Sequence, residues 1–225
     1  MTASTTAANG PATKRDYEAS IAAGLLIGFL VIPILATALP DLYSKIWPAV
    51  MIFFLVASPA GIFIASKLYN VIPLIWQVAK FVLIGGLNTL VDIGILAALM
   101  SFFKTSAGID PDSAIVNAGI LTITFYFVYK ATSFLFANVN SFFWNKYWTF
   151  SGNPAKNSGQ QFVQFLIVSV IGFLINIFFT SFIFTSVSHI GAINPSQWGL
   201  ICGAIGSIAG LAWNFVGYKL FVFKK

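Results

Sequence analysis

Long apolar runs dominate the chain, and short polar segments separate them. Each run has about 20 residues or more, the length that an α-helix needs to cross about 30 Å of hydrocarbon at about 1.5 Å per residue. The six predicted transmembrane helices are residues 21–39, 47–66, 81–103, 114–144, 162–187 and 198–221. The pattern therefore predicts an all-α integral membrane protein with six transmembrane helices.

The segment before the first apolar run shows no periodic spacing of apolar residues. It is rich in Ala and Thr and carries four charges between positions 14 and 18, which favours a disordered tail over residues 1–20. Ala36, Thr37 and Ala38 follow the first apolar run and imitate the cleavage site of a secretory signal. We interpret the run as a retained helix, so residues 21–76 hold two helices ahead of the remaining four.

Composition agrees with a membrane environment. Of the 225 residues, 58% are hydrophobic and 8% are charged, too few charges to cover a water-soluble domain. The net charge of +6 could suggest nucleic acid, but the 12 Lys and Arg residues are scattered singly rather than gathered in a patch, so no nucleic-acid partner is expected. Most of these cations fall on the inner side, and only Lys45 and Lys104 on the outer side, if both termini are cytoplasmic.

The last four predicted helices repeat one hairpin pattern. At an offset of 84, Phe81, Asn88 and Asp92 align with Phe165, Gly172 and Asn176. At an offset of 73, Ser133, Ala137, Ser141 and Lys146 align with Gly206, Gly210, Asn214 and Lys219. The first copy is thus longer by the difference, eleven positions, which we assign to the outer loop around residues 102–112 and the adjoining helix end. Because each copy has an even number of spans, the two hairpins are predicted to be parallel repeats.

Two charged residues fall inside predicted spans. Asp92 lies 12 residues after Lys80, or about 18 Å along its helix, near the middle of the bilayer. Lys130 lies about 24 Å from Lys146, at a comparable depth. Because an unpaired charge at this depth costs several kcal/mol, Asp92 and Lys130 are natural partners.

Three motifs resemble the GtrA-like membrane proteins: VLIGGLNTLVDIGIL at 82–96, WNKYWTF at 144–150 and WNFVGYKLFVF at 213–223. The likeness covers residues 77–225. It implies a four-helix core in a bacterial or archaeal cytoplasmic membrane that flips polyprenyl-phosphate-linked monosaccharides for cell-wall or surface-polysaccharide glycosylation, beside a polyprenyl-phosphate glycosyltransferase. The family usually has an asparagine where Ser141 stands, and the two helices before residue 81 lie outside its core, so they could add a partner or dimer surface.

The candidate substrate-binding residues are Asn88, Asp92, Lys130, Asn145, Lys146, Asn176, Asn214 and Lys219. If the resemblance holds, the lysines would offset phosphate charge, and Asp92 and the amides would bond sugar hydroxyls. Alternatively, Asp92 and Lys130 form a structural ion pair, and Lys146 and Lys219, each followed by aromatic residues, anchor the helix ends among lipid head groups.

Catalysis is not expected. The sequence has no nucleophile–base arrangement and no phosphate-binding glycine loop, and Cys202 and His189 each stand alone, so neither a cofactor nor a metal is predicted. Two other functions stay open: a proton- or cation-coupled exporter in which Asp92 titrates, and a non-transporting subunit that stabilises a glycosyltransferase. A homodimer is compatible with so small a four-helix core.

Overall fold

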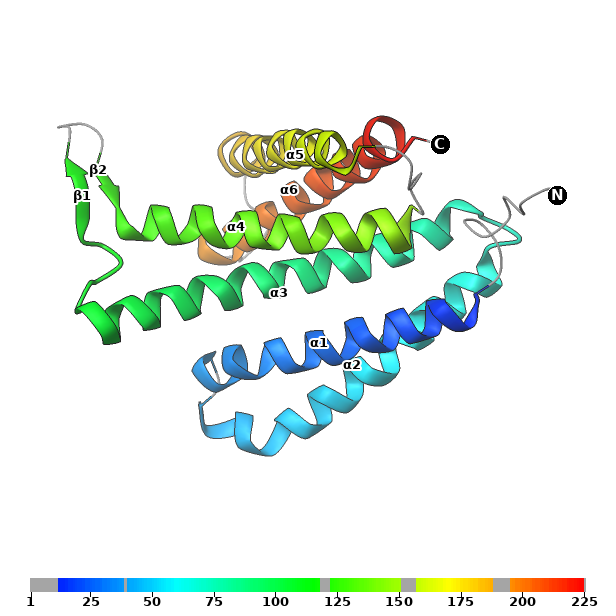
Figure 1. Cartoon of the computed structure of the whole chain (residues 1–225), viewed down its shortest axis with the longest axis horizontal. Coiled ribbons are helices and arrows are strands. Elements are labelled where there is room, and N and C mark those ends of the chain that lie inside the picture. The colour runs from blue at the N-terminus through cyan, green and yellow to red at the C-terminus, as the bar shows by residue number, and fades with distance from the viewer. Residues whose placement is uncertain (1–11, 39, 118–121, 151–156, 188–194, 225) are drawn as a thin grey trace. The chain divides into compact units, whose positions relative to one another are not determined.

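The computed structural model describes residues 12–38, 40–117, 122–150, 157–187 and 195–224. Within them lie six long helices: α1 (Lys14–Ala38), α2 (Pro40–Leu68), α3 (Leu74–Ala107), α4 (Phe125–Trp144), α5 (Ser158–Ser186) and α6 (Pro195–Gly217) (Figure 1). Two short strands, β1 (Ala114–Asn117) and β2 (Thr122–Thr124), pair antiparallel between α3 and α4. The predicted all-α membrane class is confirmed, with one small strand pair added.

Five of the six helices are long and apolar enough to cross a membrane, and α4 is the exception. It has 20 residues, and its sequence includes Lys130, Asn138 and Asn140. Large apolar side chains such as Phe53 and Ile208, 62% and 67% exposed, project outward from the helices. In lipid these side chains would meet hydrocarbon rather than water.

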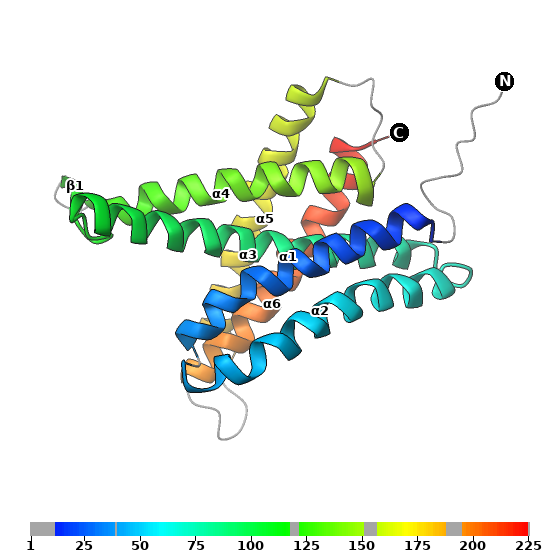
Figure 2. The same ribbon diagram turned by 60° about the horizontal axis from the view of Figure 1, so that its bottom comes forward.

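The chain divides into two compact units, residues 1–149 and 150–225. In the first, α1 packs along α2, α3 packs along α4, and both α1 and α2 contact α3; Figure 2 shows α1 beside α2. In the second, α5 packs along α6. This division does not coincide with the predicted boundary between residues 76 and 77, because the first two helices share one core with α3.

Small residues bring α1 close to α2. A Cβ added to Gly24 would lie 2.8 Å from Ser58 Oγ, and one added to Gly28 would lie 3.3 Å from Met51 Cα. The hydrophobic core of this unit includes Ile27 of α1 and the fully buried Leu87 of α3. Close backbone approach is the usual way in which membrane helices gain van der Waals contact.

The start of α1 corrects the predicted tail. The helix begins at Lys14 rather than at residue 21, so residues 14–20 are helical, whereas residues 1–11 lie outside the described part of the chain. Thr13 precedes the first turn, and its backbone N–H and hydroxyl both donate to Asp16 Oδ2, at 2.9 and 2.7 Å. This Thr-x-x-Asp arrangement supplies one half of a capping box: the carboxylate three residues into the helix accepts from the backbone N–H of Thr13, which favours a helix start here.

The predicted fourth span, residues 114–144, is wrong in its first third. Ala114 pairs with Thr124 and Asn117 with Thr122 in the strand pair, and the helix begins only at Phe125. The strands are rich in β-branched residues, which favour extended backbone over helix. Before them, α3 ends at Ala107, and the next residue, Gly108, has a φ of +68°, which suits a residue without Cβ.

The helix bounds match the predicted offsets of the repeat. Helices α3 and α5 begin at Leu74 and Ser158, which repeats the offset of 84, and α4 and α6 end at Trp144 and Gly217, which repeats the offset of 73. Each hairpin then closes with a π-helical turn, η1 (Asn145–Thr149) and η2 (Tyr218–Val222), related by the second of these offsets. Because π-helical turns are rare, their matched positions support duplication independently of the residue pattern. The longer α3 and the strand pair accommodate the extra residues of the first copy. The parallel orientation of the hairpins stays a prediction.

Candidate functional site

The first hairpin carries the predicted pair of charges. Asp92 of α3 and Lys130 of α4 form an ion pair, as their predicted depths required. Ser133, one turn after Lys130, donates its hydroxyl proton to Asp92 Oδ1 at 2.6 Å. The Lys130 side chain is nevertheless 41% exposed and that of Asp92 20% exposed, so the pair can be reached from outside the hairpin.

One helical turn before Asp92, Asn88 presents a buried amide oxygen. Its Oδ1 has no hydrogen-bond partner among the residues that the structure describes. At the end of α4, Asn145 is almost fully buried and donates from Nδ2 to the backbone oxygen and Oγ of Ser141, at 2.8 and 3.1 Å, while its Oδ1 has no partner in the same described region. A buried amide oxygen without a donor costs free energy, which a water or a ligand hydroxyl could recover.

The second hairpin is neutral at the position that corresponds to Asp92. Asn176, the counterpart, accepts a hydrogen bond from Thr180 Oγ1 at 3.1 Å and donates weakly to Ser207 Oγ at 3.4 Å. Glycines draw its two helices together: a Cβ on Gly206 would lie 2.8 Å from Asn176 Oδ1, and one on Gly210 would lie 2.7 Å from Gly172 O. Tight packing is therefore the role of these glycines.

Each hairpin carries one further amide, on the first helix in the first hairpin and on the second helix in the second hairpin. In the second, Asn214 of α6 faces Gly172 of α5, where an added Cβ would come within 2.7 Å of the amide carbon. The sequence offsets put Asn88 at the position of Gly172 and Ser141 at that of Asn214. The large amide and the small residue have thus exchanged helices, and Asn88 and Asn214 both have a buried Oδ1 without a donor in the described structure.

The two lysines at the hairpin ends differ. Lys146 is 1% exposed, with Nζ 5.6 Å from the ring centres of Phe142 and Tyr147. Lys219 is partly exposed, with Nζ 5.8 Å from the Phe215 ring. The Lys146 side chain is therefore buried in the protein beside aromatic rings, and its predicted position among head groups stays a prediction. Lys219 is open to an anionic group.

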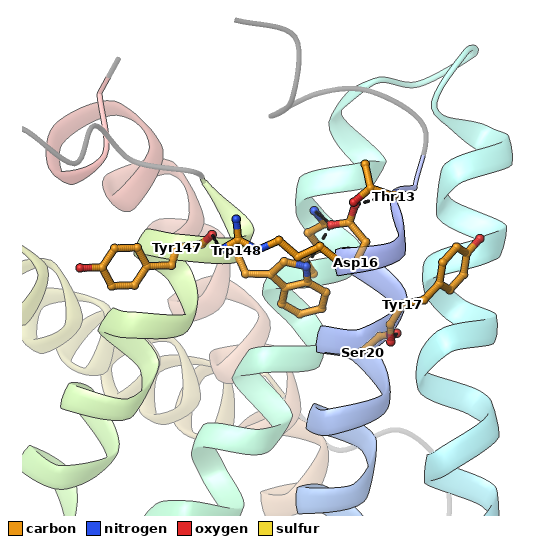
Figure 3. A network of polar contacts seen from close by, with 8 residues as sticks. Thr13, Asp16, Tyr17, Ser20, Tyr147 and Trp148 are labelled. Atoms are coloured by element: carbon orange, nitrogen blue, oxygen red, sulfur yellow. Dashed lines mark hydrogen bonds and ion pairs between the residues drawn. The ribbon is translucent and has the colours of Figure 1, made fainter. Parts of the chain in front are cut away.

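Sequence reasoning missed a buried cluster, the Asp16 cluster, formed by Thr13, Asp16, Trp76, Lys80 and Trp148. Lys80 Nζ lies 2.5 Å from Asp16 Oδ1, and Trp148 Nε1 donates to the same oxygen at 3.0 Å (Figure 3). The Lys80 ammonium also lies over two indole rings, 4.3 Å from that of Trp76 and 5.3 Å from that of Trp148. The cluster ties the start of α1 to α3 and η1.

Both charges of the cluster are enclosed, with side-chain exposures of 5% for Lys80 and 10% for Asp16. The sequence interpretation placed Asp16 in a disordered tail and gave Lys80 a role in topology alone. The signal available in the sequence was the Thr13-x-x-Asp16 capping pattern, which places a helix start well before residue 21.

The structure contains no group of three or more metal-binding side chains within the part of the chain that it describes. Cys202 is fully buried, and His189 lies outside the described residues. The binding groups that the described hairpins offer are amides, hydroxyls and lysine ammonium groups.

Comparison with known proteins identifies a family. The family model described as GtrA/DPMS, transmembrane domain, matches residues 80–223, more than half of the chain. No curated protein and no solved structure matches the chain significantly. The match begins at Lys80 and so covers α4, α5, α6 and nearly all of α3, but neither α1 nor α2.

Proposed function

Because the chain belongs to the GtrA/DPMS transmembrane family, we propose that it flips a polyprenyl-phosphate-linked monosaccharide across the cytoplasmic membrane, for cell-wall or surface-polysaccharide glycosylation. The observation that carries this proposal is the accessible ion pair of Asp92 and Lys130. A phosphate cannot cross hydrocarbon without a cation near it, and Lys130 supplies one at mid-depth.

In the resting protein Asp92 neutralises Lys130, and Ser133 holds the carboxylate in place. An arriving phosphate would share Lys130 with Asp92, so the ammonium never stands unpaired in lipid. The exposure of Lys130 allows this exchange without prior separation of α3 from α4.

The sugar would bond to amides rather than to charges. In the first hairpin the amide oxygen of Asn88 can accept a hydroxyl proton; the second hairpin, taken by itself, offers the amide oxygen of Asn214 and the amide of Asn176. Asn145 and Lys219 belong to the two helix ends, where the head group would enter or leave. Lys146 would contribute its positive charge from within the protein, without direct contact. The polyprenyl tail would stay in the surrounding lipid.

The proposed orientation puts both termini in the cytoplasm. Synthesis of the lipid-linked sugar on that side and its consumption on the other would supply the gradient for net transport. A polyprenyl-phosphate glycosyltransferase is the expected partner, and the chain itself is expected to carry out no reaction. A second copy of the chain could complete the enclosure as a homodimer.

The test is translocation in liposomes. Purified protein is reconstituted with a polyprenyl-phosphate hexose, and the rate at which the sugar becomes accessible on the opposite leaflet is measured. Lys130→Ala should abolish acceleration while leaving the reconstituted amount unchanged. Lys104→Ala is the matched control, since Lys104 pairs with Asp110 at 2.6 Å on an exposed surface. Wild-type rates in Lys130→Ala would overturn the phosphate role.

The same assay separates the two rivals. A proton-coupled exporter would respond to an imposed proton gradient and lose that response in Asp92→Asn. A non-transporting subunit would move no sugar lipid in any variant, yet the glycosyltransferase would fail in cells that lack it.

A further inference from the structure

Unit 1 carries an open cavity of about 360 Å³ beside the Asp16 cluster. Three parts of the chain line it: α1 through Arg15, α4 through Asn140, Phe143 and Trp144, and η1 through Tyr147. Its volume is near the lower end of the range for small-molecule sites, about 300–1,000 Å³. It can therefore hold a head group but no long hydrocarbon chain.

The cavity has a cation whose charge is not neutralised nearby. Arg15 is exposed and forms no ion pair among the described residues; its Nη2 donates only a long hydrogen bond, 3.4 Å, to the backbone oxygen of Tyr147. The neighbouring Asp16 cannot serve it, because that carboxylate is committed to Thr13, Lys80 and Trp148. Glu18, further along the same helix, pairs with Lys14.

The wall of the cavity also holds a second, buried donor. Asn140 lines the cavity, and its Nδ2 has no acceptor within the described structure. Guanidinium and amide N–H groups are donors only, so the two residues together favour a ligand rich in acceptor oxygens, and the charge of Arg15 favours an anionic one.

The remaining wall is aromatic. Phe143 and Tyr147 stack in parallel planes, 7° apart with ring centres at 6.1 Å, and both are nearly half exposed. Trp144 adds an indole beside them. Flat, exposed rings suit the apolar face of a sugar or the first units of a prenyl chain, and they lie next to the cation rather than apart from it.

We propose that this cavity binds the phosphoryl-sugar head group of a prenyl lipid before translocation, with Arg15 on the phosphate and the aromatic wall against the sugar and the start of the chain. The inference rests on the proposed function for the choice of lipid. It also gives the added helix α1 a role: α1 lies outside the matched family region, yet it supplies the exposed cation of a site whose other walls are α4 and η1. The Asp16 cluster fixes α1 in the position that this requires.

The experiment measures binding without transport. The full chain in nanodiscs of neutral phosphatidylcholine is titrated with a short-chain prenyl phosphate hexose, and quenching of tryptophan fluorescence reports occupancy. Arg15→Ala should weaken binding at least about tenfold, since it removes a charge-assisted contact. Lys14→Ala is the matched control: Lys14 is the adjacent cation, its side chain is 92% exposed, and it does not line the cavity.

Asn140→Asp tests the same site without removing the cation. The new carboxylate should weaken binding of the prenyl phosphate hexose, while a short-chain prenol without phosphate should bind as before. Wild-type affinity in both Arg15→Ala and Asn140→Asp would overturn the proposal. So would equal competition by phosphatidylglycerol, which would indicate a general anionic-lipid site, or by inorganic phosphate, which would indicate a site for the free ion.

These outcomes are distinct from failure of the proposed function. A protein that binds through Arg15 but moves no sugar lipid in liposomes retains this site and refutes the flippase. A protein that flips the lipid while both Arg15→Ala and Asn140→Asp bind it normally retains the flippase and refutes this site.

Discussion

Loss of the Asp16 carboxylate should destabilise the first unit more than loss of any exposed charge. In Asp16→Asn, Lys80 keeps its 5% exposed side chain but loses its counter-ion. Breaking one partner of a buried ion pair costs about 3–5 kcal/mol, because the other charge is left uncompensated. Asn has a single acceptor oxygen, so it can accept from Trp148 or from Thr13 but not from both, and the expected penalty lies in this range.

The assay is thermal unfolding of the full chain in nanodiscs. For a chain of this size about 1 kcal/mol shifts Tm by about 2–4 °C, so Asp16→Asn should lower the apparent Tm by roughly 6–20 °C. Lys14→Ala, which breaks only the exposed pair with Glu18, should shift it by less than about 4 °C. Because unfolding in lipid is often irreversible, all variants are compared at one heating rate.

A double variant separates charge from packing. Asp16→Asn with Lys80→Met removes both charges and leaves the hydrogen bonds at position 16 as they are in the single variant. It should recover much of the stability lost in Asp16→Asn, since no uncompensated buried charge remains. An apparent Tm of Asp16→Asn indistinguishable from that of the wild type would refute the reasoning. So would a double variant that is less stable than the single one.

Two further predictions concern the hairpins. Gly172→Val should lower the apparent Tm strongly, because its Cβ would overlap the amide of Asn214 on the facing helix. Gly86→Ala has open space around the added atom, so it should leave Tm unchanged or raise it slightly. Equal shifts in the two variants would contradict the packing argument. The double variant Asp92→Lys with Lys130→Asp should preserve folding, as judged by size-exclusion chromatography, because the ion pair is kept. It should reduce translocation, because the cation then lies on α3. Wild-type transport by this variant would show that only the presence of the pair matters.

The Asp92–Lys130 pair was predictable because depth in a membrane can be worked out from the sequence. A helix rises by a fixed amount per residue, so the distance of each charge from its helix end places both at comparable depth. The high cost of an isolated charge there leaves pairing as the most favourable arrangement. The repeat was predictable for a similar reason, since its offsets are properties of the sequence alone, and the π-helical turns fall at matched positions.

The Asp16 cluster was not predictable in the same way. Asp16 lies 64 residues from Lys80 and 132 from Trp148, and no local pattern joins such distant positions. The capping pattern at Thr13 could have revealed the helix start, but the partners of Asp16 depend on how α1 packs against α3. The strand pair was missed because a run of apolar, β-branched residues fits either a span or strands, and length favoured the span.

The differences between the hairpins point to a division of labour after duplication. The first has charges, with Ser133, Ala137 and Ser141 along α4; the second has a neutral amide at the counterpart of Asp92, with Gly206 and Gly210 in close contact with α5. In the proposed function the charged site exchanges partners, which needs accessible side chains, and Lys130 is accessible. A neutral site that only bonds hydroxyls can be held between tightly packed backbones. The exchange of amide and small residue fits this difference. Asn88 and Ser141 of the first hairpin correspond to Gly172 and Asn214 of the second, so each hairpin keeps one amide at this pair of positions, while only the first carries the cation.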